Sequence, residues 1–276
     1  MKIMPPTSAI LLLFLSGCSS LEPLFTEEVK NEMAADLRQS QEFFTEQDIA
    51  PLPAPVQKYF RACGFIGREK MRNAKIEWKD ANIKRTPEGD WMPLECVQYN
   101  FVRSPARFVY LNAALWGIIP FDGRDKYQNG EGNMYIRVMN LFTVENASGR
   151  EMDQSSLVTI LAESMMVPSY VLQPYIQWTA VDSLTAEAAL TYNGITVRGT
   201  FFFNEQGEYI RFESNDRFQS SGGINKKYPW STTSAQYKDF GGFRQATIIT
   251  AIWKMENGDY QYWKGEIGSI RYNVTE

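Results

Sequence analysis

Histidine is absent from this chain of 276 residues, and only three cysteines are present. Without histidine there is no serine–histidine or cysteine–histidine catalytic pair and no imidazole ligand for a metal ion. The cysteines lack any C-x-x-C spacing, which argues against a thiolate zinc site. We therefore expect no such metal site, no cofactor and no chemistry that depends on imidazole.

Excess positive charge and long apolar runs are also missing. The net charge is −4 and no basic stripe stands out, so we expect no nucleic-acid partner. Beyond the N-terminal segment, no apolar run reaches the roughly 18 residues that a transmembrane helix needs. Aromatic residues, by contrast, make up 14% of the chain, which suits β-strands and apolar cavities.

Residues 1–17 predict a signal peptide. Residues 9–15 form an apolar run that is too short to span a bilayer. The run ends in Leu15-Ser-Gly-Cys18, which resembles a bacterial lipobox, so Cys18 is the expected lipidation site and residues 18–25 the lipidated tether. Ser19 favours the outer membrane, on its periplasmic face, over the inner membrane. The alternative is an ordinary secretory signal with a chance cysteine.

A helix with an unusually wide apolar arc is predicted at residues 153–167. Asp153 is a favourable N-cap, and Pro168 ends the helix because proline has no N–H group to donate. Apolar side chains recur at helical spacing and cover most of the circumference. Such an arc indicates a helix that is pressed deep into a larger surface.

Two strands joined by a turn follow this helix. Residues 195–203 and 209–217 alternate with a period of two, and Asn204-Glu-Gln-Gly207 between them predicts a hairpin turn. Alternation puts two apolar sets on one face: Ile195, Val197, Phe201 and Phe203 on the first strand, and Ile210 and Phe212 on the second. A buried helix followed by hairpins predicts a sheet that curves around a helical filling.

The sequence therefore predicts one α+β domain over residues 26–276: a single antiparallel, curved β-sheet, half-barrel-like, packed around a few helices. Two further helices are expected, at about 26–44 and 55–63. The clearest strands are expected at 74–84, 91–102, 106–116, 133–144, 230–237, 243–254 and 260–272, with a hairpin tip at 125–132. In all we expect ten to twelve strands.

Several short motifs resemble an uncharacterised bacterial family known only as a domain of unknown function. They are Leu52-Pro-Ala-Pro-Val-Gln-Lys-Tyr-Phe60, Trp91-Met-Pro93, Gln98-Tyr99, the set Asp125, Gly130, Gly132 and Met134, Leu161-Ala-Glu163 with Pro168, Asn215-Asp-Arg217, and Tyr262-Trp-Lys-Gly-Glu-Ile267. This resemblance covers about residues 50–273 and implies no established activity. The order of elements is also similar to that of lipoprotein carriers of the LolA/LolB/LppX type, which implies acyl-chain binding in a cavity.

Seven residues are candidates for ligand binding. Five are aromatic and would line an apolar cavity: Phe201, Phe203, Phe212, Trp230 and Trp263. The same residues would also suit a filled core. Glu163 and Arg217 form a candidate polar pair that would fix the helix or receive a polar ligand group. The alternative is a solvated glutamate and an unrelated surface arginine.

Cys63 and Cys96 remain after lipidation of the third cysteine. In an oxidising compartment they could pair as a disulfide. The alternative is two small buried hydrophobic side chains on separate elements.

These observations favour a membrane-anchored envelope lipoprotein that is not an enzyme. Its expected partners are the membrane and an apolar ligand, such as an acyl chain or lipid, or a lipidated protein. A structural or assembly lipoprotein without a ligand cavity is one alternative. A hydrolase that uses Glu163, Glu213 and Asp216 is another, but the sequence gives neither the spacing nor the raised pKa that such catalysis needs.

Overall fold

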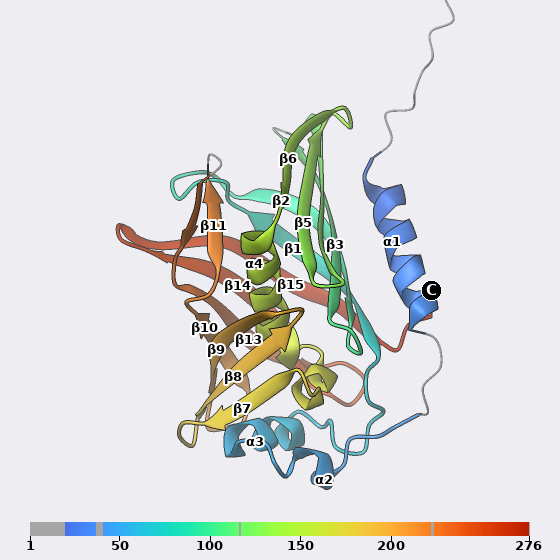
Figure 1. Cartoon of the computed structure of the whole chain (residues 1–276), viewed down its shortest axis with the longest axis vertical. Coiled ribbons are helices and arrows are strands. Elements are labelled where there is room, and N and C mark those ends of the chain that lie inside the picture. The colour runs from blue at the N-terminus through green and yellow to red at the C-terminus, as the bar shows by residue number, and fades with distance from the viewer. Residues whose placement is uncertain (1–19, 37–40, 116, 222–223, 276) are drawn as a thin grey trace, which may run out of the picture.

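The computed structural model describes residues 20–36, 41–115, 117–221 and 224–275, and these fold into a curved antiparallel sheet around one helix (Figure 1). Its described strands are β1 (Asn73–Ile83), β2 (Met92–Phe101), β3 (Ala106–Leu115), β4 (Ile119–Gln128), β5 (Glu131–Val138), β6 (Phe142–Ser148), β7 (Ile176–Ala180), β8 (Thr185–Tyr192), β9 (Ile195–Phe203), β10 (Tyr209–Ser214), β11 (Phe218–Ser221), β12 (Ile224–Lys227), β13 (Trp230–Asp239), β14 (Arg244–Met255) and β15 (Gly258–Tyr272).

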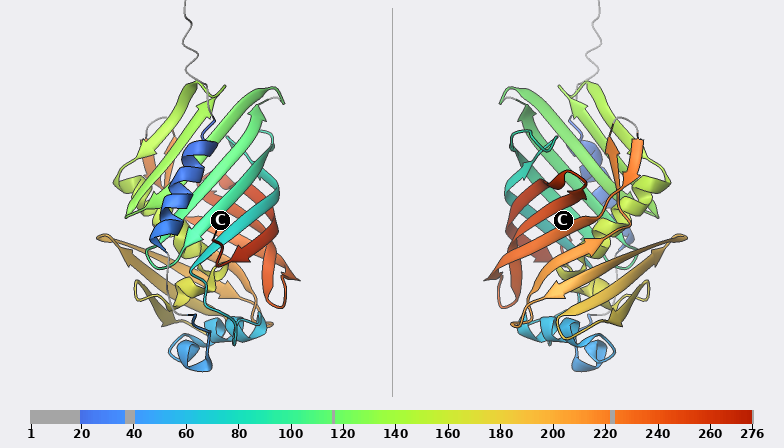
Figure 2. Two further views of the ribbon diagram at one scale, coloured as in Figure 1. Left: turned by 90° about the vertical axis from the view of Figure 1, so that its right-hand side faces the viewer. Right: turned by 90° about the vertical axis from the view of Figure 1, so that its left-hand side faces the viewer.

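Four α-helices and two 3₁₀ turns accompany these strands in the described chain. They are α1 (Glu22–Ala35), α2 (Glu46–Ile49), α3 (Ala54–Ala62), α4 (Arg150–Ala162), η1 (Glu163–Met165) and η2 (Pro168–Leu172). Helix α1 lies on the outside of the sheet, and α2 and α3 lie together at one end of the molecule (Figure 2). None of the described helices has the length and apolar character needed to cross a bilayer.

The strand order explains why a helix fills the concave side. Thirteen strands follow the order β6-β5-β4-β3-β2-β1-β15-β14-β13-β10-β9-β8-β7, and β11 pairs only with β12. The first and last strands of the chain therefore meet in the middle, while β6 and β7 are the two edges. The connection between these edges contains α4, η1 and η2, and it crosses the concave face (Figure 1). The predicted fold class, a single curved antiparallel sheet around helices, is confirmed, and the sheet is not closed.

Helix α4 is buried as its wide apolar arc predicted, but it begins earlier, and it ends at Ala162, where the 3₁₀ turn η1 follows, instead of continuing to Pro168. Leu157, Ile160 and Leu161 are fully buried. The N-cap is Gly149, whose φ of 102° suits glycine, and not Asp153. Asp153 lies one turn inside the helix, where its Oδ1 accepts a hydrogen bond of 2.7 Å from the backbone N–H of Gly132. Its carboxylate therefore ties α4 to β5 instead of capping the helix.

Helix α1 also begins earlier than expected, ends at Ala35 instead of near residue 44, and covers the convex face of β2 and β3. Phe25 is buried, with its ring centroid 5.9 Å from that of Tyr99 and 5.7 Å from that of Tyr110. Leu21, which we assigned to the tether, is buried as well. Because α1 covers one face and α4 the other, β2 is buried over most of its C-terminal half instead of alternating.

The hairpin of β9 and β10 shows how a bulge overrides a regular pattern. The burial of β9 alternates as predicted, with Val197, Phe201 and Phe203 inward. The register shifts between Tyr209 and Arg211, so Ile210 is 38% exposed while Phe212 is fully buried. The prediction that Ile210 shares the inner face was therefore wrong.

Several strands have no clear signature in the sequence. β4 contains Pro120 and an Asp-Gly pair, and β8 is rich in alanine, so both have low strand propensity. The predicted single strand at 133–144 is two strands, because Met139 and Asn140 turn the chain with positive φ angles. These additions bring the described chain to fifteen strands, above the ten to twelve expected.

Candidate ligand-binding cavity

A cavity of about 160 Å³ remains between α4 and the concave face of the sheet. Its volume is close to that of an engineered protein cavity of about 150 Å³ that binds benzene. Most of its wall is apolar, and these side chains come from seven strands, α4 and the turn after it: Trp78, Ile83, Val109, Leu111, Met134, Ala162, Met166, Tyr209, Trp230, Ile249, Ala251, Tyr262 and Trp263.

One side of the wall carries a hydrogen-bonded network around Glu163, at the end of α4. The Nε of Arg107 donates to both oxygens of Glu163 at 3.0 Å, and its Nη1 donates to Asp125 at 2.6 Å. The side-chain amides of Gln98 and Asn100 donate to Glu163 Oε2 at 2.8 and 3.0 Å. The network therefore joins the end of α4 to β2, β3 and β4.

Arg107 is charged and its charge is balanced. Burial alone would lower the pKa of its guanidinium, but the carboxylates of Glu163 and Asp125 outweigh burial and raise that pKa. Two carboxylates thus share a single guanidinium. In the described part of the chain no three histidine, cysteine, aspartate or glutamate side chains gather as a metal site would require.

Arg217 is the second arginine on the wall, and its surroundings differ. Its Nη1 donates to the backbone carbonyl of Ser155 at 2.8 Å and to the hydroxyl of Thr159. Its guanidinium lies over the rings of Trp230 and Trp253, 4.5 and 5.7 Å from their centroids. Its Nε is buried without a hydrogen-bond partner, and none of the described carboxylates forms an ion pair with it.

A family model supplies the first link to known proteins. The model describes a family of unknown function (DUF6544) and matches residues 42–265. The chain belongs to DUF6544. Among solved structures, the crystal structure of a LolA superfamily protein from Nitrosomonas europaea is similar, with a TM-score of 0.45 and 7% sequence identity over 79% of this chain and 94% of that chain. No functionally curated protein matches the sequence.

Segments that suggested the family from the sequence alone meet at the cavity of this DUF6544 protein. The residues from those segments that line it are Gln98, Asp125, Met134, Ala162, Glu163, Arg217, Tyr262 and Trp263. They are far apart in the sequence and come together because β2, β4, β5 and β15 share the concave face with α4.

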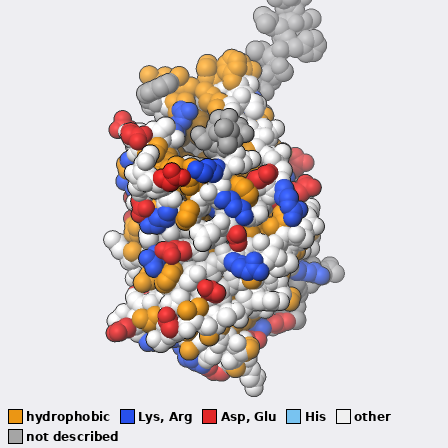
Figure 3. Space-filling view, turned by 60° about the vertical axis from the view of Figure 1, so that its left-hand side comes forward, with side chains coloured by type: hydrophobic (Ala, Val, Ile, Leu, Met, Phe, Trp, Pro, Cys, Tyr) orange, Lys and Arg blue, Asp and Glu red, His pale blue; other side chains and the backbone are white. Residues whose placement is uncertain are grey.

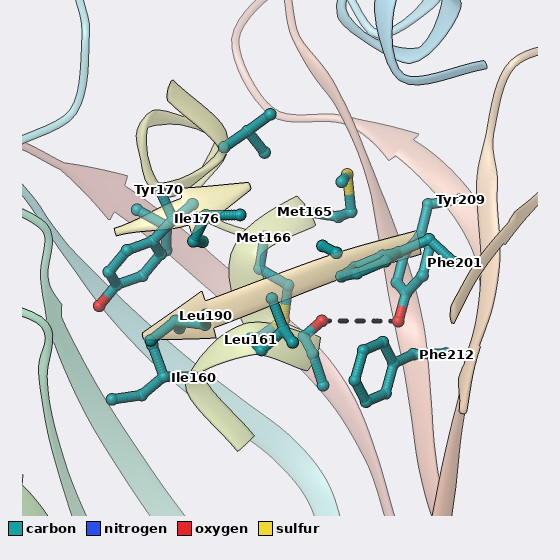
Figure 4. Close-up of a cluster of buried hydrophobic side chains, with 14 of the residues drawn as sticks. Ile160, Leu161, Met165, Met166, Tyr170, Ile176, Leu190, Phe201, Tyr209 and Phe212 are labelled. Atoms are coloured by element: carbon teal, nitrogen blue, oxygen red, sulfur yellow. Dashed lines mark hydrogen bonds between the residues drawn. The ribbon is translucent and has the colours of Figure 1, made fainter. Parts of the chain in front are cut away.

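The seven predicted ligand residues divide into two groups. Glu163, Arg217, Trp230 and Trp263 line the cavity. Phe201, Phe203 and Phe212 do not, because they pack into the main core instead, as Figure 4 shows for Phe201 and Phe212. The ring centroids of Phe201 and Phe212 are 4.9 Å apart, and both side chains are fully buried. Tyr209, whose hydroxyl donates to the Ala162 carbonyl at 3.5 Å, stands beside this core and reaches the cavity.

Glu163 and Arg217 are not the ion pair that the sequence suggested. Glu163 pairs with Arg107, while Arg217 binds the helix through Ser155 and Thr159. The alternative, a solvated glutamate and an unrelated surface arginine, is also wrong. The Glu163 side chain is only 12% exposed, and both residues face the same cavity.

Cys63 and Cys96 are free and buried, so they do not form the disulfide that the sequence left possible. Cys63 follows α3 in the main core, whereas Cys96 lies on β2 in a separate cluster beside the cavity. Burial raises the pKa of Cys63 to about 12 and also raises the pKa of Cys96. Both behave as small buried side chains, as the alternative interpretation expected. The predicted lipidation site, Cys18, lies outside the described residues.

Arg107 and Asn100 were not predicted as site residues from the sequence, and Gln98 and Asp125 were noted only within motifs. A signal was present, because Cys96, Gln98 and Asn100 alternate on one face of a strand. Two amides at inward positions of a buried strand need partners. In this structure their partner is Glu163.

Proposed function

We propose that this protein binds one end of an acyl chain in the concave cavity, and that it does so as a non-catalytic, lipid-anchored protein of the bacterial envelope. The observation that carries the proposal is the cavity itself: an apolar, tryptophan-rich space on whose wall Arg217 has a buried Nε without a partner.

The apolar wall favours a hydrocarbon ligand. Trp78, Trp230 and Trp263 contribute large apolar surfaces, and transfer of a hydrocarbon chain from water to such a space is favourable by roughly 0.8 kcal/mol per methylene. The volume of about 160 Å³ is below the roughly 300 Å³ at which pockets for drug-sized ligands begin. We therefore expect a short chain, or one end of a longer chain.

Arg217 favours a ligand with an anionic end. Its guanidinium is held in place by Ser155, Thr159 and the ring of Trp230, so little side-chain entropy is lost when it binds a ligand. Arg107 is less suitable because Glu163 and Asp125 already balance its charge. A carboxylate or phosphate beside Arg217 would supply the partner that its Nε lacks.

Catalysis by this wall is disfavoured by how its reactive groups are held. Glu163 and Asp125 both accept hydrogen bonds from Arg107, so neither is poised to exchange a proton with a substrate. Cys96 also lines the cavity, but burial raises the pKa of its thiol and keeps the nucleophilic thiolate scarce. We therefore prefer binding to hydrolysis.

Anchoring completes the proposal. The Leu15-Ser-Gly-Cys18 sequence supports acylation of Cys18, and Ser19 supports the outer membrane and its periplasmic face. Acylation with two or more chains gives stable attachment, whereas a single chain gives marginal attachment.

The test is calorimetric titration of the full-length protein with octanoate and with octanol. A charge-assisted hydrogen bond is worth about 1.5–3 kcal/mol, so wild type should prefer octanoate by about 10- to 100-fold. Arg217→Met should abolish that preference. The matched control is Arg211→Met, because Arg211 also lies over an aromatic ring, that of Phe202, but outside the cavity.

A second pair of variants tests whether octanoate binds in the cavity. Ala251→Phe places a ring in the cavity and should prevent binding, while Ala235→Phe adds the same ring at an exposed position. If wild type shows no saturable octanoate binding, or if Ala251→Phe binds as well as wild type, the acyl-binding proposal is wrong.

A further inference from the structure

Five large apolar side chains are exposed together at one end of the sheet. Ile118 is 83% exposed, and it lies in the turn between β3 and β4. The other four belong to the β5–β6 hairpin: Met139, Leu141, Phe142 and Val144, each 53–58% exposed. Hydrophobic side chains gather at this end in the space-filling view (Figure 3). We name these five residues the apolar tip.

The two turns of the apolar tip are joined and carry no charge. The backbone N–H of Met139 donates to the carbonyl of Pro120 at 2.7 Å, which holds one turn beside the other. Residues 117–121 and 138–144 contain no aspartate, glutamate, lysine or arginine. Exposed apolar patches of this kind mark protein or membrane contact sites. The guanidinium of Arg137 donates to the backbone carbonyl of Asn140 beside this patch, so the patch could enter the interfacial layer of a bilayer while this charge stays among the polar headgroups.

The start of the described chain lies at the same end. The backbone N–H of Leu21, just before α1, donates to the carboxylate of Asp122 on β4. Asp122 is four residues from Ile118 and is paired in register with Arg137, two residues before Met139. Cys18 is three residues before Leu21, so it lies within roughly 11 Å of it even if the chain is fully extended.

We propose that the apolar tip inserts into the interfacial layer of the lipid bilayer that carries the Cys18 anchor. This rests on the anchoring part of the proposed function and not on the ligand. Insertion would fix the orientation of the molecule, because α2 and α3 lie at the opposite end and would point away from the membrane (Figure 2). Insertion would also cover the start of β6, which is an edge strand of the sheet. The exposed apolar residues there would otherwise favour pairing with another chain.

The experiment measures contact between defined positions and lipid in the full-length protein. Phe142→Cys is labelled with an environment-sensitive fluorophore, and the protein is reconstituted in phosphatidylethanolamine–phosphatidylglycerol vesicles containing a nitroxide-labelled phospholipid. Cys63 and Cys96 are buried and will not take the label. Mass spectrometry of the N-terminal peptide records whether Cys18 is acylated.

Two control positions separate insertion from mere tethering. Glu27→Cys places the label on an exposed site of α1, about 9 Å along the helix from Leu21 and therefore also near the anchor. Val181→Cys places it on a valine that is 52% exposed in the turn between β7 and β8. We expect nitroxide quenching to be several-fold stronger at residue 142 than at either control.

Equal quenching at residues 142 and 27 would overturn the proposal, because the anchor alone would then explain the proximity. Absence of quenching at residue 142 would overturn it too, and dimerisation through that position would assign the tip to a second copy of the chain. Octanoate titration of the same samples reports on the cavity independently. If residue 142 is quenched but octanoate does not bind, the ligand proposal is wrong and membrane insertion is still supported.

Discussion

Glu163 is the residue whose replacement tests the structure of the site most directly. We predict that Glu163→Gln lowers the free energy of unfolding by about 3 kcal/mol, the lower end of the range for breaking a buried ion pair. The side chains of Glu163 and Arg107 are 12% and 13% exposed, so solvent screens the pair only weakly. Glutamine has nearly the same size, so the loss would not come from an empty space.

The free energy of unfolding should fall because hydrogen-bond donors surround this carboxylate. Glu163 Oε1 faces the guanidinium of Arg107, and Oε2 faces the amide groups of Gln98 and Asn100 as well. The new amide group would place its own N–H donors against one of these donor sets in either orientation. The negative charge would also be lost, and of the two carboxylates that contact Arg107 only that of Asp125 would remain.

The assay is urea unfolding of the purified protein together with thermal unfolding. For a domain of this size, about 3 kcal/mol corresponds to a decrease in Tm of roughly 6–12 °C. Glu213→Gln is the matched control, since Glu213 is 41% exposed and pairs with Arg211 at 3.4 Å. It should cost less than about 1 kcal/mol. A Glu163→Gln protein as stable as the control would refute the idea that this network holds the end of α4.

Three other predictions concern separate parts of the chain. Cys18→Ser should release the protein from its firm membrane association, as measured by cell fractionation, and a variant that stays with membranes as wild type does would contradict lipidation. Gly132→Ala should destabilise the fold by about 1–3 kcal/mol in urea unfolding, because a Cβ there would lie 2.8 Å from the carbonyl oxygen of Met152 in α4. Unchanged stability would contradict the tight packing of β5 against α4. Cys63 and Cys96 should not react with a thiol reagent at pH 8 in the native protein, because burial raises the pKa of both thiols and the reactive thiolate is scarce. Both should react in denaturant, and rapid labelling of the native protein would contradict their burial.

The fold was predictable where a pattern was long and local. The apolar arc at 153–167 and the alternation at 195–203 depend on neighbouring residues, and both elements are present as buried helix and strand. The prediction was wrong at Ile210, where a bulge that depends on pairing with β9 turned the side chain outward. Alternation along one strand cannot reveal a bulge, because the extra residue is defined by the partner strand.

The candidate site was only half predictable for a related reason. Glu163 stands out because it is a carboxylate directly after the mostly apolar stretch 157–162, and this property is local. Its partner depends on which strand lies opposite the end of α4, and the sheet order puts β3 with Arg107 there instead of the segment that ends in Arg217. The chain separation of Glu163 and Arg107 is 56 residues, and no spacing rule joins them. The sequence does show that inward polar residues on β2 and β3 need a hydrogen-bond acceptor. The curvature of the sheet brings the carboxylate of Glu163 within reach of Gln98, Asn100 and Arg107, and this curvature cannot be read from the sequence.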